Sequence, residues 1–329
     1  MTDAGEDAIA LPEPRSNRPT TLAHRAEYAA ALGLGAFFRL IGVDAASAVA
    51  GAFTRAIGPL IAPISRRARV NLKIAFPGMS KEDVEAILRD SWENLGRTTA
   101  EFAHLSKFDP DAEDHRLEIV GRERLDAIRT GGKPAILVSG HFANWEVMSI
   151  AFRAAGLDYA FIYRAANNPL IDGLIIRTRA RVMSRRQIPK GKRGGRELIE
   201  ALGAGVSLAM LVDQKLNTGG IPSPLFGKPA MTAPAPARLA LKYRAPILPI
   251  EVERVRGARF RVTVHDAVAF APSGDAAADA QRLTDLVNLE IEKLIRKRPG
   301  QWLWLHRRWG KEEYRRITPP ADIPPSTRR

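Results

Sequence analysis

Residues 135–146, AILVSGHFANWE, join a short apolar run to a segment of aromatic and polar residues. The run AILVS has the length and the apolar content of a buried strand. Asn144 is a good helix N-cap and would place Glu146 in the first helical turn, where the helix dipole favours a carboxylate. The stretch therefore predicts a strand, a turn that carries His141, and a helix.

The same succession continues along the chain. Helical segments are predicted first, at 71–105, where Ser80 and Asp83 have a spacing close to that of a capping box. Strands separated by helices then predict an α/β fold with a largely parallel central sheet flanked by helices. Strands are predicted at 117–120, 135–140, 159–164, 206–212, 247–255 and 260–266, and helices at 144–156, 169–184, 194–203, 233–243 and 276–297.

The region before this pattern divides into two parts. Residues 1–25 are polar and lack a secretory signal, which predicts a disordered tail. Residues 26–65 are apolar, but no uninterrupted run reaches the roughly 18–20 residues that a spanning helix needs. One tilted membrane anchor, two short helices in the membrane interface and a buried hairpin all fit this segment. Residues 66–317 are predicted to form the main domain, and 318–329 a flexible tail.

Composition restricts the chemistry and the partners. The chain has no cysteine, which excludes disulfides, thiolate metal sites and a thiol nucleophile. Its net charge of +14 indicates anionic partners, namely nucleic acid, a membrane surface, or an acidic protein or substrate, unless it reflects genome bias alone. Nine of these cations and no acid lie between Arg177 and Arg196, so at least one face is locally cationic.

His141 and Glu146 suggest acid–base chemistry. A turn between them can fold the imidazole against the carboxylate, which would fix its tautomer and leave the other ring nitrogen to accept a proton. Ser139 lies in no GxSxG context, and the six histidines show no metal-ligand spacing, so neither a metal nor a cofactor is expected. The pair then favours direct transfer, in which His141 deprotonates a hydroxyl that attacks an activated acyl group. A structural histidine near a helix start is the alternative.

GHFANWE resembles the H-x4-D/E block of the glycerolipid acyltransferase superfamily, and in particular the late lipid A acyltransferases that add lauroyl or myristoyl chains. The resemblance covers roughly residues 28–316 in ordered blocks. These are RRARVNLKIAFPGMS (66–80), SWENLGRTTAEF (91–102), YRAANNP (163–169), GVSLAMLVDQ (205–214), PLFGKPAMTAPAPARLAL (224–241), ILPIEVER (247–254) and PGQWLWLHRRW (299–309).

The resemblance implies secondary acylation in lipopolysaccharide biosynthesis at the cytoplasmic face of the bacterial inner membrane. The donor would be acyl carrier protein, the acceptor a hydroxyl of a lipid A precursor, and the membrane partner anionic lipid. His141 would be the base, oriented by Glu146. A same-fold acyltransferase on a lysophospholipid or a glycosylated phosphoinositide is the rival enzyme. A basic nucleic-acid-binding protein would leave the apolar segment and the His–Glu block unexplained, so no nucleic-acid partner is expected, and the oligomeric state is open.

The other blocks supply candidate binding residues. Arg164 follows an apolar strand and would hold a phosphate or hydroxyl of the acceptor. Asp213 ends another strand and would bind sugar hydroxyls, position Arg164 or Lys215, or cap the loop. Phe226 and Gly227 form a turn that would line an acyl-chain groove. The predicted substrate-binding set is Asn144, Arg164, Asp213, Gln214, Lys215, Phe226 and Gly227, and a basic surface of Arg185, Arg186, Lys192 and Arg193 beside the active-site mouth would dock the carrier protein.

Overall fold

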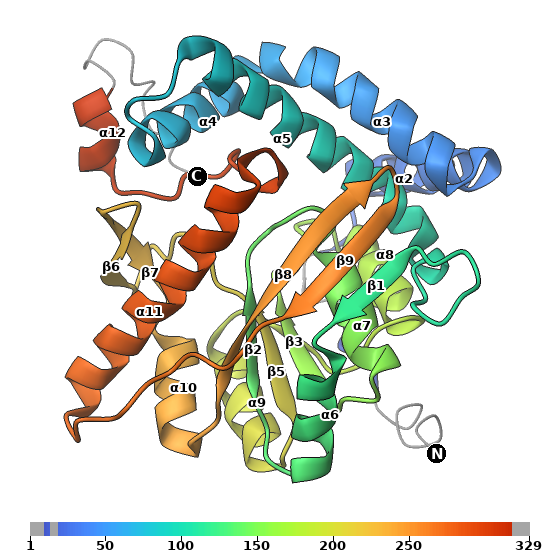
Figure 1. Cartoon of the computed structure of the whole chain (residues 1–329). Helices are drawn as coiled ribbons and strands as arrows, with labels where there is room; N and C mark the ends of the chain where they lie inside the picture. The colour runs from blue at the N-terminus through green and yellow to red at the C-terminus, as the bar shows by residue number, and fades with distance from the viewer. Residues whose placement is uncertain (1–9, 14–18, 318–329) are drawn as a thin grey trace.

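A seven-stranded sheet forms the centre of the computed structural model, which describes residues 10–13 and 19–317 (Figure 1). The strand order is β1-β9-β8-β2-β5-β3-β4. The strands from β8 to β4 run parallel, whereas β9 is antiparallel to β8 and carries β1 with it. The strands are β1 (Leu117–Val120), β2 (Ile136–Ser139), β3 (Tyr159–Tyr163), β4 (Gln187–Pro189), β5 (Ser207–Leu211), β8 (Ile247–Arg256) and β9 (Arg259–Val264).

Helices connect these strands and cover the sheet. Helix α7 packs on β1, β8 and β9, while α9 and α10 pack on the strands between β4 and β8. The helices between the strands are α6 (Arg122–Gly131), α7 (Glu146–Ala154), α8 (Pro169–Ala180), α9 (Lys192–Gly203) and α10 (Ala235–Tyr243), and the chain ends with α11 (Ala276–Lys297), the short η3 (Pro299–Gln301) and α12 (Lys311–Ile317).

The predicted largely parallel α/β architecture is confirmed, with all six predicted strands and all five helices predicted after residue 140. Three short strands were not predicted. Strand β4 has only three residues, and the hairpin of β6 (Ile221–Leu225) and β7 (Lys228–Thr232) contains prolines that favour a loop. Its two-residue turn has positive φ at Phe226 (52°) and Gly227 (67°), the backbone that a tight hairpin requires.

Helices from the amino-terminal third lie across one end of the sheet (Figure 1). Helix α3 runs along α5 at close range because Gly51 and Gly96 have no side chain; a Cβ on Gly96 would lie 2.5 Å from the carbonyl oxygen of Ala50. The segment before the main domain is therefore packed onto that domain. These helices are α2 (Leu22–Ile41), α3 (Val43–Ile57), η1 (Gly58–Leu60), α4 (Ala62–Ala75), α5 (Lys81–Glu101) and η2 (Phe102–Lys107).

Helix α2 corrects the predicted tail. The Thr21 side chain caps the helix, so residues 22–25 are helical and the tail prediction was wrong for them. Most of the two predicted tails lies outside the described residues, namely 1–9, 14–18 and 318–329. Within the described part, no single helix is long and apolar enough to cross a bilayer; residues 43–60 and 62–75 meet that length and composition only together, with a bend of 89° between them.

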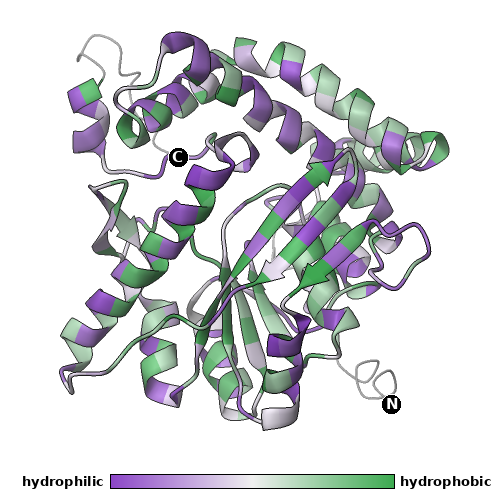
Figure 2. Cartoon of the chain, in the orientation of Figure 1, coloured by the Kyte–Doolittle hydropathy of each residue, from purple (hydrophilic) through white to green (hydrophobic). Residues whose placement is uncertain are grey.

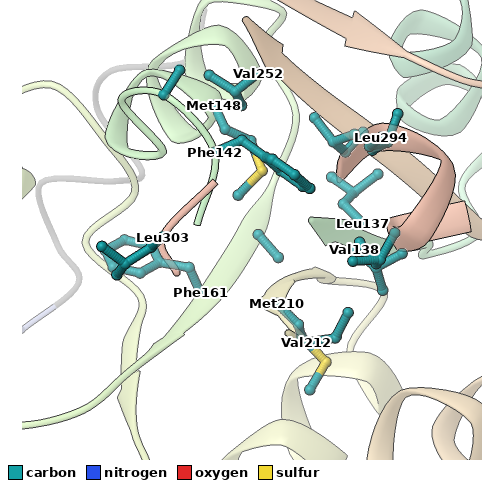
Figure 3. Packing of buried hydrophobic residues seen from close by; sticks show 14 of the residues in the cluster. Leu137, Val138, Phe142, Met148, Phe161, Met210, Val212, Val252, Leu294 and Leu303 are labelled. Carbon is teal, nitrogen blue, oxygen red and sulfur yellow. The ribbon is translucent and has the colours of Figure 1, made fainter. Parts of the chain in front are cut away.

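The apolar core explains why β2 is a continuous apolar run. All four of its residues are buried, and Leu137 and Val138 pack among side chains from β5, β8 and α11 (Figure 3). A central parallel strand is covered on both faces and therefore lacks the polar alternation of a surface strand. The loop that leaves β2 thus starts from one of the most buried strands of the molecule.

Candidate active site

The chain reverses direction sharply between β2 and α7. Ala143 makes this turn possible by adopting φ of 44°, a left-handed conformation that a residue with a Cβ adopts only at a cost of about 1–2 kcal/mol. The carbonyl of Ala143 accepts hydrogen bonds from Asn94 Nδ2 and Thr98 Oγ1, both 2.9 Å long, and its amide donates to Gln301 at 2.8 Å. Contacts from α5 and from the carboxyl-terminal region therefore hold the turn in shape.

The carboxyl-terminal region also pairs directly with the loop. Phe142 forms an isolated antiparallel bridge with Trp302, and the amide of Leu303 donates to the carbonyl of His141 at 3.1 Å. Trp302 is 2% exposed and Trp304 fully buried. These tryptophans thus belong to the core, and they fix the backbone on both sides of the histidine.

Asp213 is the carboxylate that holds His141. Its Oδ1 lies 2.8 Å from His141 Nδ1, and its Oδ2 accepts hydrogen bonds of 2.8 Å from the His141 amide and from Trp302 Nε1. Asp213 follows β5 by two residues and His141 follows β2 by two, and these strands pair in parallel, so both residues lie at the carboxyl edge of the sheet. Asp213 was predicted to position Arg164 or Lys215, but its carboxylate holds His141 instead.

The environment of Asp213 fixes the protonation of this pair. Burial alone would raise the pKa of Asp213, but the charge of His141 and the hydrogen bonds from its ring, its amide and Trp302 outweigh burial and hold the pKa well below its usual value. An ionised Asp213 requires a proton on Nδ1 of the imidazole. Nε2 is then unprotonated and can act as an acceptor, and it accepts a hydrogen bond from the amide nitrogen of Gln214 at 3.3 Å.

Glu146 does not contact His141 as predicted. Its carboxylate forms a bidentate ion pair with Arg179 of α8, with distances of 2.5 and 2.9 Å, and the side chain is only 7% exposed. The predicted contact is wrong because Glu146 begins a helix whose first turn faces α8, whereas the ring of His141 turns toward β5. The H-x4-E block therefore holds two separate pairs, His141 with Asp213 and Glu146 with Arg179.

Asn144 is a structural residue in this fold. It is fully buried; its Oδ1 accepts from the Glu146 amide at 3.2 Å, close to the predicted cap, and its Nδ2 donates to Glu101 at 3.0 Å. Glu101 also accepts from Ser47 of α3 and from Arg254 of β8. The predicted substrate-binding role of Asn144 is therefore corrected, because its amide ties the loop to α3, α5 and β8.

Phe226 and Gly227 are likewise not part of a groove. Phe226 is 7% exposed and packs on Phe76, with ring centroids 5.0 Å apart, and on Trp304 and Trp309. Gly227 supplies the second left-handed residue of the hairpin turn. The prediction of an acyl-chain groove here was wrong, because the apolar turn is buried by aromatic side chains from distant segments.

Arg164 and Lys215 do lie at the carboxyl edge of the sheet, because they follow β3 and β5. Neither forms an ion pair with a carboxylate among residues 10–13 and 19–317. The amide of Lys190, the residue after β4, donates to the carbonyl of Tyr163 at 2.8 Å and so places a third cation near Arg164. A small pocket of about 10 Å³, here called the histidine pocket, lies at this edge and is lined by His141, Asp213, Gln214, Trp302, Leu303, His306, Arg307 and Arg308.

The predicted docking surface has a different position from the one expected. Arg185 and Arg186 precede β4, and Arg186 pairs with Asp158, which precedes β3. Both arginines therefore lie toward the amino edge of the sheet, opposite His141, and the predicted place beside the active-site mouth was wrong for them. Arg193 pairs with Glu197 along α9, and the side chain of Lys192 lies outside the described part of the structure.

An apolar cavity of about 380 Å³ lies beside the start of α7. Helices α2, α5 and α8 provide its walls, with Leu32, Leu95 and Leu174 among the lining residues. Trp145 and the Glu146–Arg179 pair also line it, and the Trp145 ring contacts the His141 ring edge-to-face with centroids 5.0 Å apart. The cavity thus extends to the neighbourhood of the histidine.

Several residues of this site were not found from the sequence. Arg179 was counted only as one of nine cations, and Asn94, Thr98 and Glu101 only as part of a helical segment. Trp302 and Arg308 were noted only as part of the block PGQWLWLHRRW. The one usable signal was Asp213 at the end of a buried strand, since parallel neighbours bring their carboxyl ends to the same edge.

Comparison with known proteins identifies the family. Residues 17–311 match the family model described as bacterial lipid A biosynthesis acyltransferase. The chain is 26% identical over 263 residues to the lipid A biosynthesis palmitoleoyltransferase of Escherichia coli K12, covering 77% of this chain and 82% of that one. It is also 26% identical over 254 residues to the lauroyltransferase of the same organism, with coverage of 75% and 80%.

A solved structure was also matched, the 1-acyl-sn-glycerophosphate (LPA) acyltransferase PlsC from Thermotoga maritima. The match has 18% identity, covers 72% of this chain and 98% of the other, and has a TM-score of 0.33, which is too low to bear on the fold. The family match extends over most of the chain and includes both the histidine loop and Asp213. The chain belongs to the bacterial lipid A biosynthesis acyltransferases and is an O-acyltransferase of lipid A biosynthesis.

Proposed function

We propose that this acyltransferase moves a fatty acyl group from acyl carrier protein to a hydroxyl of an acyl chain on a phosphorylated lipid A precursor. The observation that carries the mechanism is the fixed imidazole: Asp213 holds Nδ1 at 2.8 Å, and Nε2 is left to accept a proton. Neither a nucleophilic side chain nor a covalent enzyme intermediate is needed for this chemistry.

In the proposed reaction His141 Nε2 takes the proton of the acceptor hydroxyl while the oxygen attacks the thioester carbonyl carbon. Collapse of the tetrahedral intermediate breaks the carbon–sulfur bond, and the leaving thiolate takes the proton back from the imidazolium. Asp213 stabilises the imidazolium and keeps the ring in one orientation. Glu146 contributes indirectly, because its pair with Arg179 holds Trp145 and the wall of the apolar cavity in place beside the histidine.

The apolar cavity supports a long-chain acyl donor. Its volume of about 380 Å³ has room for about a dozen groups the size of a water molecule, at roughly 30 Å³ each, and a methylene is of similar size. The position next to Trp145 would bring the carbonyl end of such a chain to His141. Apolar burial gives about 0.8 kcal/mol per methylene, which favours a donor that fills the cavity.

We also infer that the enzyme works at the cytoplasmic face of the inner membrane, with α2 and α3 as interfacial helices. Both helices are rich in apolar residues (Figure 2), and they leave large hydrophobic side chains in contact with solvent. Such a concentration of exposed apolar side chains is typical of an interaction surface. The exposed side chains include Leu34, Phe37 and Leu40 of α2, Val49 and Phe53 of α3, and Leu60 of the adjoining η1.

Transfer in a purified system tests this proposal. Enzyme, acyl carrier protein charged with a labelled acyl chain, and lipid A precursor should yield labelled lipid. His141→Gln should abolish the product while circular dichroism and melting temperature stay close to those of the wild type. Equal turnover by His141→Gln and wild type would show that the histidine is not the base.

A further inference from the structure

Four cations from separate parts of the chain gather beside the histidine pocket. Arg67 Nη1 donates to the carbonyl of Leu305 at 3.4 Å, and the guanidinium of Arg307 lies 4.6 Å from the centroid of the Tyr314 ring. Both arginines are thus held on the segment that pairs with the His141 loop. The four cations, here called the cation cluster, are Arg67 of α4, Lys215 after β5, Arg307 after η3 and Lys311 of α12.

No carboxylate neutralises the cation cluster in the part of the chain that the structure describes. Burial lowers the pKa of Lys215, and the charges of Arg307 and Lys311 lower it further, as expected for cations that face one another. In α12 the carboxylate of Glu313 is paired with Arg316 at 2.7 Å, and both oxygens of Asp213 are taken by His141 and Trp302. Like charges held together in this way favour a bound anion.

Arg308 adds a second, independent observation. The side chain is 2% exposed, and its guanidinium donates only to neutral oxygens, those of Met231, Thr232 and Asn288. Its Nε has no hydrogen-bond partner. The charge of Asp213 favours the protonated guanidinium, but Asp213 forms no hydrogen bond with it, and a buried cation that lacks such a partner is costly unless a ligand supplies more negative charge. Arg308 lines the histidine pocket together with Arg307, so it lies behind the cation cluster.

On the basis of the proposed acyl transfer, we propose that the cation cluster and Arg308 bind a phosphate monoester of the acceptor. Arginine and lysine supply the donors that phosphate oxygens need. The phosphate and the donor chain are assigned to different places because the apolar cavity, which lies toward α2 and α8, shares no lining residue with the histidine pocket. The donor chain would enter from the cavity side, the acceptor phosphate would rest on the cation cluster, and His141 would lie between them.

The test compares an acceptor that carries its phosphates with the same acceptor after removal of phosphate. Arg307→Gln/Lys311→Gln should raise KM for the phosphorylated acceptor by about 10- to 100-fold, the range for losing hydrogen bonds to a charged group. The change in kcat and in KM for the acyl donor should be below threefold. Wild-type enzyme should show a similar rise in KM when the acceptor is dephosphorylated. With that dephosphorylated acceptor, the double variant and wild type should have the same KM.

Arg238→Gln/Lys242→Gln is the matched control. It removes two exposed cations from α10, which leads into the amino end of β8, and should leave both KM values unchanged. An equal rise in KM for both forms of the acceptor in Arg307→Gln/Lys311→Gln would overturn the phosphate site. The phosphate site would also be overturned if that variant floated less well with phosphatidylglycerol vesicles while its KM ratio for the two forms of the acceptor stayed unchanged. The cluster would then bind membrane phosphate. No transfer by wild-type enzyme would instead overturn the proposed function.

Discussion

Replacing Asp213 by asparagine should nearly stop catalysis while leaving the fold intact. Oδ2 of Asp213 accepts two N–H groups, from His141 and Trp302, whereas Oδ1 accepts from the imidazole alone. The asparagine oxygen will therefore take the position of Oδ2, because the amide nitrogen cannot accept these two donors. The amide nitrogen then faces His141 Nδ1 and donates to it.

That donation moves the imidazole proton to Nε2, which can no longer accept the proton of the acceptor hydroxyl. A wrongly held tautomer in a comparable histidine–carboxylate pair costs about 10⁴ in kcat. We therefore expect kcat to fall by roughly 10³–10⁴, equivalent to about 4–5.5 kcal/mol of transition-state stabilisation. The donors of the loop and of Trp302 stay bonded, so the melting temperature should change by only a few degrees.

Initial rates with labelled acyl carrier protein and saturating lipid A precursor measure this effect. Glu146→Gln is the comparison, since it also neutralises a buried carboxylate near the histidine loop while the His141–Asp213 pair stays intact. Its kcat should fall less than that of Asp213→Asn by at least tenfold. If Glu146→Gln is the more damaging variant, or if Asp213→Asn keeps more than a tenth of wild-type kcat, the assignment of Asp213 as the orienting residue is refuted.

Four further outcomes are expected. Arg179→Met leaves Glu146 buried without a partner and should lower the unfolding free energy in urea by about 3–5 kcal/mol; a loss below 1 kcal/mol would contradict the buried pair. Ala143→Gly relieves a left-handed alanine and should raise stability by up to about 1 kcal/mol, while kcat falls severalfold as the loop loosens; a lower melting temperature would argue against the strained turn. Burial alone would raise the pKa of Glu251, but His265 and Lys297 hold that pKa at about 2. The ionised carboxylate should therefore add on the order of 3 kcal/mol to the unfolding free energy above its unfolded pKa of about 4.3, and this stabilisation is lost as pH falls toward 2. In urea melts, the unfolding free energy of Glu251→Gln should fall less across that pH window than that of wild type. Phe53→Glu places a charge on an exposed residue of α3 and should reduce flotation with phosphatidylglycerol vesicles, and unchanged flotation would remove α3 from the membrane surface.

The sequence was sufficient for the fold where periodicity and strand ends carry the information. Buried strands such as β2 and β5 are continuous apolar runs, so the parallel sheet and the edge that bears His141 and Asp213 follow from local patterns. Strand β4 and the β6–β7 hairpin were missed because three residues and a proline-rich segment give no periodic signal.

The partners of the site residues depend on the direction of each side chain, which spacing does not determine. Glu146 lies five residues from His141, but α7 turns it toward Arg179, and the histidine instead meets a residue 72 positions away. Asn144 and Phe226 were predicted to face substrate, yet Glu101 and Trp304 from remote segments bury them. Sequence patterns thus located the edge of the sheet that bears His141 and Asp213 but could not assign each residue its partner.

Mass spectrometry of lipid A from a strain that lacks this gene tests the central claim most directly. We predict lipid A that lacks one secondary acyl chain, restoration of that chain by the wild-type gene, and no restoration by a gene encoding His141→Ala at equal protein level. An unchanged number of acyl chains in the deletion strain, or full restoration by His141→Ala, would contradict acyl transfer to lipid A with His141 as its base.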